Sequence, residues 1–127
     1  MSETTLPDDV KRFVLTSIPS VPYLEAVLLL RRESDASWTA AQLGRRIYLA
    51  EAKASDLLSD LREAGIATTA SQAEATYRYQ PAPELRQMLD MLARHYSSNL
   101  VAVTDLIHSS LDRRAHRFAD AFRWRKD

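Results

Sequence analysis

The stretch Thr39–Ile66 has the sequence TAAQLGRRIYLAEAKASDLLSDLREAGI and contains the clearest helix start in the chain. Thr39 and Gln42 have the spacing of a capping box, in which each side chain accepts a hydrogen bond from the other residue's backbone N–H. Trp38 and Leu43 occupy the two positions of a hydrophobic staple around the same helix start. The pattern predicts a helix from Thr39 to about Tyr48.

A second helix is expected after a brief turn at residues 49–50. It covers residues 51–64, and Gly65 follows at the position just past a helix where a positive φ costs least. Two short strands, Ile66–Thr69 and Thr76–Gln80, are then expected to form a hairpin, because β-branched and aromatic residues alternate in the second strand.

Two more helices are predicted before this stretch. Pro7 opens a short helix that ends near Ile18. The next helix starts with Ser20 as its N-cap and runs to about Glu33. Its apolar residues wrap most of the way round, which predicts a central, buried helix. Residues 34–37 form a polar connector.

A long helix is expected from Glu84 to about Ser109, roughly 40 Å in length at 1.5 Å per residue. An apolar stripe at near-heptad spacing runs along it. The other residues cannot cover such a stripe if the helix is straight, so two copies of the chain are expected to pair through it. The alternative is that the last helix of the chain folds back and covers the stripe within one chain, through a bend that the polar residues 97–99 would allow. The stripe comprises Leu85, Met88, Leu89, Leu92, Tyr96, Leu100, Val103 and Ile107.

A last helix is predicted from Asp112 to about Trp124, in a region rich in arginine. These cations are expected either to be solvated or to contact phosphates. They are Arg113, Arg114, Arg117, Arg123, Arg125 and Lys126.

The composition narrows the possible functions. The 127 residues include 17 basic and 17 acidic side chains, so binding to nucleic acid needs a local basic patch. The absence of cysteine excludes disulfides and thiolate chemistry. No spacing fits a metal site, a phosphate loop or a catalytic nucleophile, so no metal, no cofactor and no enzymatic activity are expected. No signal peptide or membrane-spanning run is present, and a cytoplasmic protein is expected.

The segment Thr39–Ile66 resembles the winged helix-turn-helix of bacterial regulators of the MarR-like kind. Gly44 matches the small residue where two helices of that motif approach closely. The other matches are the apolar anchors Leu43 and Ile47, the turn residue Leu49, the buried positions Ala54, Leu58 and Leu61, and the Ala64–Ile66 sequence that leads into the wing.

The resemblance implies a mainly α fold with a small β-hairpin wing. Residues 1–19 would form an N-terminal helix or arm, residues 20–83 the winged helix-turn-helix domain, and residues 84–127 the long C-terminal helices. A role in transcription regulation, with double-stranded DNA bound by a homodimer, is the function that this family implies.

The family's DNA contacts come from the wing and from exposed positions early in the helix that begins at Glu51. On this sequence, Lys53 and Ser55 would face the groove, and Arg45, Arg46 and Arg78 would hold phosphates. The dimer would be held by Leu85, Leu89, Leu92, Tyr96, Leu100, Val103 and Ile107.

A second function is open because the same helix carries Glu51, Asp56, Asp60 and Glu63. Carboxylates at phosphate distance weaken DNA binding. The helix could instead bind a basic protein partner, and the module would then serve protein–protein interaction.

Overall fold

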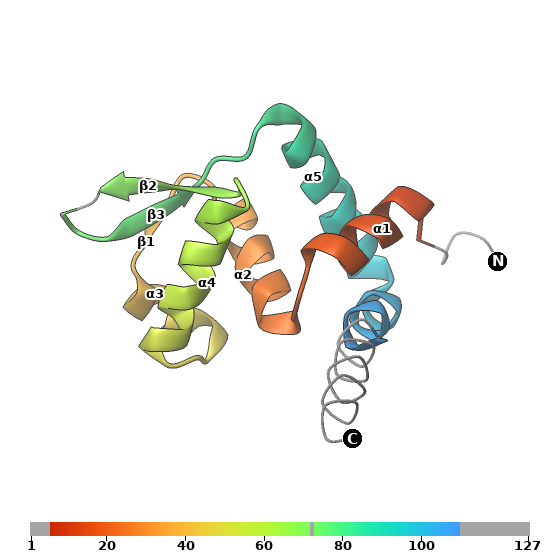
Figure 1. Cartoon of the computed structure of the whole chain (residues 1–127), viewed down its shortest axis with the longest axis horizontal. Helices are drawn as coiled ribbons and strands as arrows, with labels where there is room; N and C mark the ends of the chain where they lie inside the picture. Colours follow the sequence, from red (N-terminus) through yellow and green to blue (C-terminus); the bar gives the residue numbers. More distant parts are fainter. Residues whose placement is uncertain (1–5, 72, 110–127) are drawn as a thin grey trace, which may run out of the picture. The chain divides into compact units, whose positions relative to one another are not determined.

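The computed structural model describes residues 6–71 and 73–109, and it is mostly helical with a small antiparallel sheet (Figure 1). This confirms the mainly α prediction. The elements are α1 (Asp8–Ser17), α2 (Val21–Arg32), β1 (Ser37–Trp38), α3 (Ala40–Ile47), α4 (Glu51–Glu63), β2 (Ala67–Ser71), β3 (Thr76–Tyr79), α5 (Pro83–Ser98) and a further helix, Leu100–Ser109.

The residues of the chain group into two compact units. The central unit is Pro22–Asp90, and the terminal unit combines residues 6–21 with residues 91–109 of the described chain. The second half of α5 therefore belongs with α1, although the two are far apart in the sequence.

The start of α3 has the predicted capping box. The Thr39 backbone N–H donates to Gln42 Oε1 at 3.0 Å, and the Gln42 N–H donates to Thr39 Oγ1 at 3.1 Å. The staple residues Trp38 and Leu43 are both buried. Local sequence alone therefore fixes where α3 begins.

The turn between α3 and α4 is tight. A Cβ atom on Gly44 would lie 2.6 Å from the carbonyl oxygen of Leu49, so the close approach expected at this glycine is confirmed. The Leu49 N–H donates to the Gly44 carbonyl at 2.9 Å. Tyr48 ends α3 with φ 61° and ψ 48°, a left-handed conformation that costs a residue other than glycine about 1–2 kcal/mol.

Helix α4 buries Ala54, Leu58 and Leu61, as the resemblance implied. Gly65 follows it at φ 81°, and the Gly65 and Ile66 N–H groups donate to the carbonyls of residues 62 and 61. These two bonds are the Schellman pattern, which satisfies carbonyls at a helix end. The predicted end of this helix is confirmed.

The sheet has three strands in the order β1-β3-β2, with β3 in the middle. The predicted hairpin is present, with its strands at Ala67–Ser71 and Thr76–Tyr79 and an irregularity between Thr69 and Ser71. Strand β1 pairs Ser37 and Trp38 with the middle of β3. Sequence reasoning treated residue 37 as part of a connector, because a two-residue strand has no periodicity to detect.

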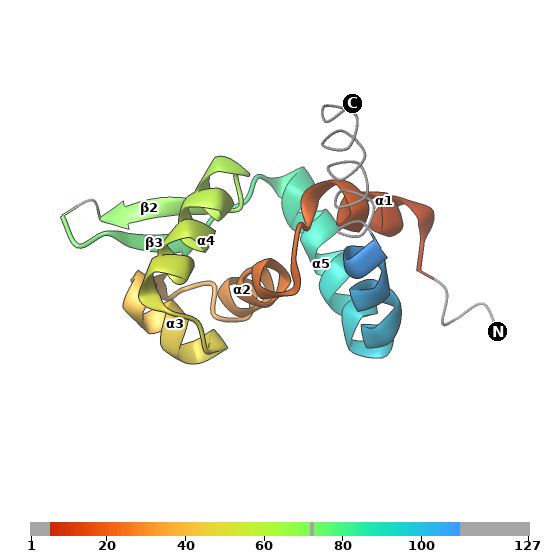
Figure 2. The same ribbon diagram turned by 60° about the horizontal axis from the view of Figure 1, so that its bottom comes forward.

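Contacts within the central unit hold its helices around the sheet. Helix α2 buries apolar side chains on most of its surface, which confirms the central position predicted for it. Helix α4 packs on α3 and, near its C-terminal end, on β2 (Figures 1 and 2). The Arg31 Nε and Asp90 Oδ1 atoms form an ion pair at 2.8 Å between α2 and α5.

The predicted long helix is interrupted at Asn99, so the expectation of one continuous helix is wrong. Asn99 is 7% exposed, and its carbonyl accepts from the Val103 N–H at 3.0 Å. It stands at the N-cap of the helix Leu100–Ser109, and asparagine is among the residues preferred there. The break expected as an alternative at residues 97–99 is present, whereas the helix expected to fold back over the stripe lies outside the described residues.

The terminal unit contains α1, the second half of α5 and the helix Leu100–Ser109, which lie beside one another in both views (Figures 1 and 2). Its buried apolar residues are Leu6, Val10, Val14, Ile18, Leu92, Val103 and Ile107. The predicted last helix and its arginines lie outside the described residues. Across the described part of the chain, no single helix is long and apolar enough to span a membrane.

Candidate macromolecule-binding face

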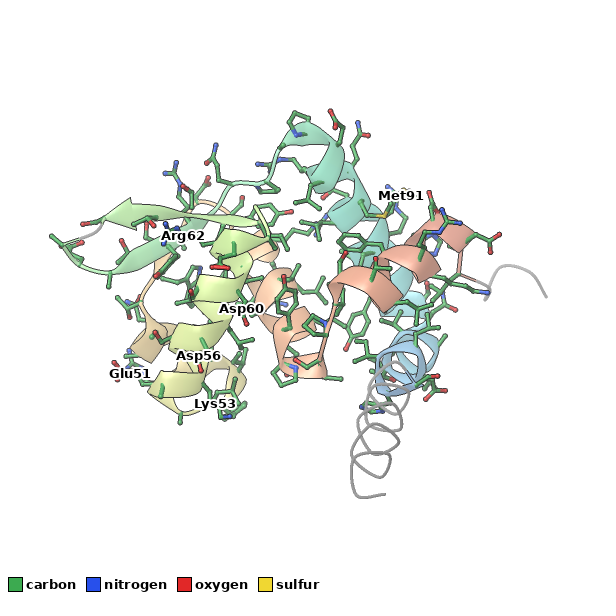
Figure 3. All side chains as sticks on the ribbon, viewed as in Figure 1. Glu51, Lys53, Asp56, Asp60, Arg62 and Met91 are labelled. Atoms are coloured by element: carbon green, nitrogen blue, oxygen red, sulfur yellow. The ribbon has the colours of Figure 1, made fainter. Side chains whose placement is uncertain are left out.

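Helix α4 presents an acidic side to solvent, opposite the side that it buries. Successive helical residues are about 100° apart. Asp56 and Glu63 therefore point away from the buried residues Ala54, Leu58 and Leu61. Figure 3 shows Glu51 and Lys53 at the first turn of the helix, Asp56 midway, and Asp60 and Arg62 in its second half. We name the exposed carboxylates Glu51, Asp56, Asp60 and Glu63 the α4 face.

The two flanks of α4 have different neighbours. Burial and then the negative charge of Asp60 raise the pKa of Tyr23, which places Asp60 toward α2. Glu51 and Ser55 lie on the other flank, which faces the hairpin. The α4 face therefore extends from the side of α2 to the side of the hairpin.

An open groove of about 750 Å³ separates the start of α4 from the hairpin. Two carboxylates line it, Glu51 from α4 and Glu74 from the loop between β2 and β3, together with the aromatic ring of Tyr77. None of the described lysines or arginines lines it. We name it the hairpin groove; its lining is Thr39, Ala40, Ala41, Glu51, Ala52, Ser55, Glu74, Ala75 and Tyr77.

The carboxylates in the second half of α4 are unfavourable for the helix itself. Its C-terminal end carries a partial negative charge, and Asp60 and Glu63 lie in the last turn. Asp56 and Asp60 are four residues apart, a spacing at which like charges repel. Two cations, Lys53 and Arg62, accompany the four carboxylates. Asp60 and Glu63 therefore cost stability, unlike Glu51 in the first turn, and this cost favours a role in binding over a role in folding.

Because of the helix dipole, removing a negative charge should change the free energy of unfolding in opposite directions at the two ends of α4. Asp60→Asn should raise the free energy of unfolding by about 0.5 kcal/mol, because it removes a charge of the wrong sign and one like-charge pair. Glu51→Gln in the first turn should lower it by about 0.5 kcal/mol. Urea unfolding followed by circular dichroism measures both, and high salt should shrink both effects. If both substitutions changed the free energy of unfolding in the same direction, the result would contradict this electrostatic account.

Arg46 is paired within the chain. Its Nη2 atom lies 2.6 Å from Glu33 Oε2, and its guanidinium carbon lies 5.4 Å from the centre of the Trp38 ring. The hydrogen bond from Arg46 lowers the pKa of Glu33. A phosphate that binds Arg46 would have to compete with Glu33, and the predicted phosphate contact stays a prediction.

The other predicted DNA contacts are exposed but dispersed. Arg45 lines a hollow of about 310 Å³ beside Arg46 and Trp38. Lys53 is exposed in the first turn of α4, whereas Ser55 lines the hairpin groove. Arg78 is exposed on β3, where its Nη2 atom donates to Gln80 Oε1 at 3.4 Å. Neither the hollow beside Arg45 nor the hairpin groove is lined by all of these residues.

The residues predicted to hold a dimer separate into two groups. Leu89, Leu92, Val103 and Ile107 have no exposed surface and are corrected to core residues of the single chain. Leu85 and Tyr96 are partly exposed, and Leu100 is 51% exposed. The break at residue 99 removes the straight stripe that would have needed a second copy. Pairing of two copies stays a prediction.

Sequence reasoning missed two features of this region. Tyr77 and Glu74 join the hairpin groove through strand register and loop conformation, which depend on non-local pairing. Tyr48 is 93% exposed and left-handed, and its sequence position just after a helix carried a weak signal for that conformation. Among the described residues, no cluster of His, Asp and Glu side chains could hold a metal ion.

Comparison with protein-family models, with curated proteins and with solved structures finds no match to this chain. The inferences about function therefore rest on the geometry and charge of the central unit.

Proposed function

We propose that the central unit is a winged helix-turn-helix module whose α4 face and hairpin groove bind a basic segment of a partner protein. The order α3, turn, α4 and hairpin supports this motif, with β2 and β3 as the wing. In such a module, the second helix of the helix-turn-helix, here α4, and the wing face the bound macromolecule. Here these two elements bring Glu51 and Glu74 together at one groove. That convergence of carboxylates is the observation that carries the proposal.

Charges that line the hairpin groove lie close enough to a bound group to discriminate between cations and anions. Two unit charges 4 Å apart interact with about 4 kcal/mol near a protein surface, where the effective dielectric constant is about 20. A phosphate in the hairpin groove would experience repulsion from both carboxylates. A lysine or arginine side chain in the same place would experience attraction. Complementary charge of this kind speeds association and sets specificity more than it sets affinity.

Double-stranded DNA bound by a dimer is the second candidate, and one observation favours it. Arg45, Lys53 and Arg78 are exposed on the three elements that carry DNA contacts in this motif. Each cation that reaches a phosphate would release counterions, so DNA binding would weaken steeply with salt. The protein would then act in transcription regulation.

An NMR titration separates the two candidates. The ¹⁵N-labelled full chain is titrated with a nona-arginine peptide and, separately, with a random-sequence DNA duplex, both at physiological salt. We expect the peptide to shift the amide signals of α4 and of residues 73–77, and the duplex to leave them in place. A nona-glutamate peptide is the control for charge and should cause no shift.

Two outcomes would overturn the protein-binding proposal. One is a duplex that binds more tightly than the peptide and shifts the signals of Arg45, Lys53 and Arg78. The other is peptide-induced shifts that spread evenly over acidic residues of both units, which would indicate non-specific attraction.

A further inference from the structure

Tyr48 is the most exposed large hydrophobic side chain among the described residues. It is 93% exposed, whereas Leu100 and Val101 of the terminal unit are 51% and 69% exposed. It also has φ 61°, in the left-handed region that favours glycine and asparagine. Neither packing nor backbone conformation in the free chain gives a reason for an aromatic residue there.

The position of Tyr48 connects it to the α4 face. It ends α3, and Glu51, which begins α4, follows three residues later. Consecutive Cα atoms are 3.8 Å apart, so the Cα atoms of these two residues lie within about 11 Å of each other. A bound segment a few residues long can therefore reach both Tyr48 and Glu51.

We propose that Tyr48 is an anchor of the interface, and that an arginine of the basic partner segment stacks on its ring. The proposal rests on the function proposed above and adds a residue that determines specificity. The face of a tyrosine ring is electron-rich and attracts cations. The planar guanidinium group of arginine stacks on such a face, whereas the ammonium group of lysine is compact and more strongly hydrated. Tyrosine is also among the residues that most often dominate interface energies.

The same geometry predicts a preference between two basic partners. Glu51 and the rest of the α4 face attract lysine and arginine through charge, with little distinction. The ring of Tyr48 favours arginine. The free chain should therefore bind nona-arginine more tightly than nona-lysine, and most of that difference should come from Tyr48.

The test uses two substitutions at Tyr48 in the full chain. Tyr48→Asn removes the ring and keeps a residue that tolerates the left-handed conformation. We expect it to weaken nona-arginine binding by roughly two- to fivefold, the factor for an exposed cation–π contact. It should change nona-lysine binding less, so the preference for arginine shrinks. Tyr48→Phe keeps the ring and should bind both peptides as the unchanged chain does.

Val101→Asn is the matched control, because it removes an exposed apolar side chain from the terminal unit. It should leave both affinities unchanged. Calorimetric titration gives the affinities, and circular dichroism verifies that each variant is folded. If Tyr48→Asn binds nona-arginine as tightly as the unchanged chain, Tyr48 is no anchor, although the α4 face can still be the binding site. If the unchanged chain binds neither peptide, the proposed function fails and this inference fails with it.

Discussion

Replacing Gly44 with alanine should lower the free energy of unfolding of the central unit by about 2 kcal/mol. The added Cβ would lie 2.6 Å from the Leu49 carbonyl oxygen and 3.6 Å from the Ala54 Cβ. The first neighbour is backbone, so it cannot move aside without shifting the turn and the hydrogen bond from the Leu49 N–H to the Gly44 carbonyl. Overpacking of this kind costs about 1–3 kcal/mol. Alanine is the better helix former by about 1 kcal/mol, so a net loss would show that the steric cost is larger.

Gly65→Ala is the matched control, since it adds the same methyl group at the end of α4. No atom lies within 4 Å of the added Cβ, but φ is 81°, so only the backbone conformation is strained. That strain should cost about 1 kcal/mol. Urea unfolding followed by circular dichroism compares the two variants. A Gly44→Ala protein as stable as the unchanged chain would mean that α3 and the turn are not packed as closely as described.

The parts of the fold that were predicted from the sequence are those fixed by local interactions. The start of α3 depends on Thr39 and Gln42, three residues apart, and the end of α4 depends on Gly65. Both sets of hydrogen bonds close within a few residues, so their patterns are visible in the sequence. The buried face of α4 follows from helical spacing in the same way.

The parts that were missed depend on contacts between distant residues. Strand β1 exists because Ser37 and Trp38 pair with β3, about forty residues later in the chain. The apolar stripe on both sides of Asn99 is compatible with a straight helix as well as with a helix that is broken at this residue. The sequence left both arrangements open, and burial of Val103 and Ile107 in the single chain distinguishes them.

The sequence predicted the negative charge of the candidate site but not its geometry. The acidic residues of α4 are exposed as expected, because they lie off the buried face. Arg46 was expected to hold a phosphate, yet Glu33, thirteen residues earlier, pairs with it. Such a pair has no local signature. That Glu74 and Glu51 line the same groove likewise depends on where the hairpin lies relative to α4.

Reversing two charges on the α4 face should exchange the preferred partner of the central unit. In the double variant Asp56→Lys/Asp60→Lys, α4 has two carboxylates and four cations instead of four carboxylates and two cations. We expect nona-arginine binding to weaken by about tenfold or more, which corresponds to a loss of about 1.4 kcal/mol or more. Binding to duplex DNA should appear at low salt. Its logarithmic salt dependence should steepen by about 0.9 for each phosphate that the new lysines contact.

The fold should tolerate this change, so a loss of peptide binding can be assigned to the surface. Both positions are exposed, and a lysine at residue 60 suits the negative end of the helix dipole. Asp8→Lys/Asp105→Lys is the matched control, because it changes the net charge equally at exposed positions of the terminal unit. Fluorescence anisotropy measures peptide and duplex binding for both double variants. Equal effects of the two would mean that net charge alone governs binding. An effect confined to α4 would locate the site there, because only a surface that contacts its partner responds to the position of a charge as well as to its sign.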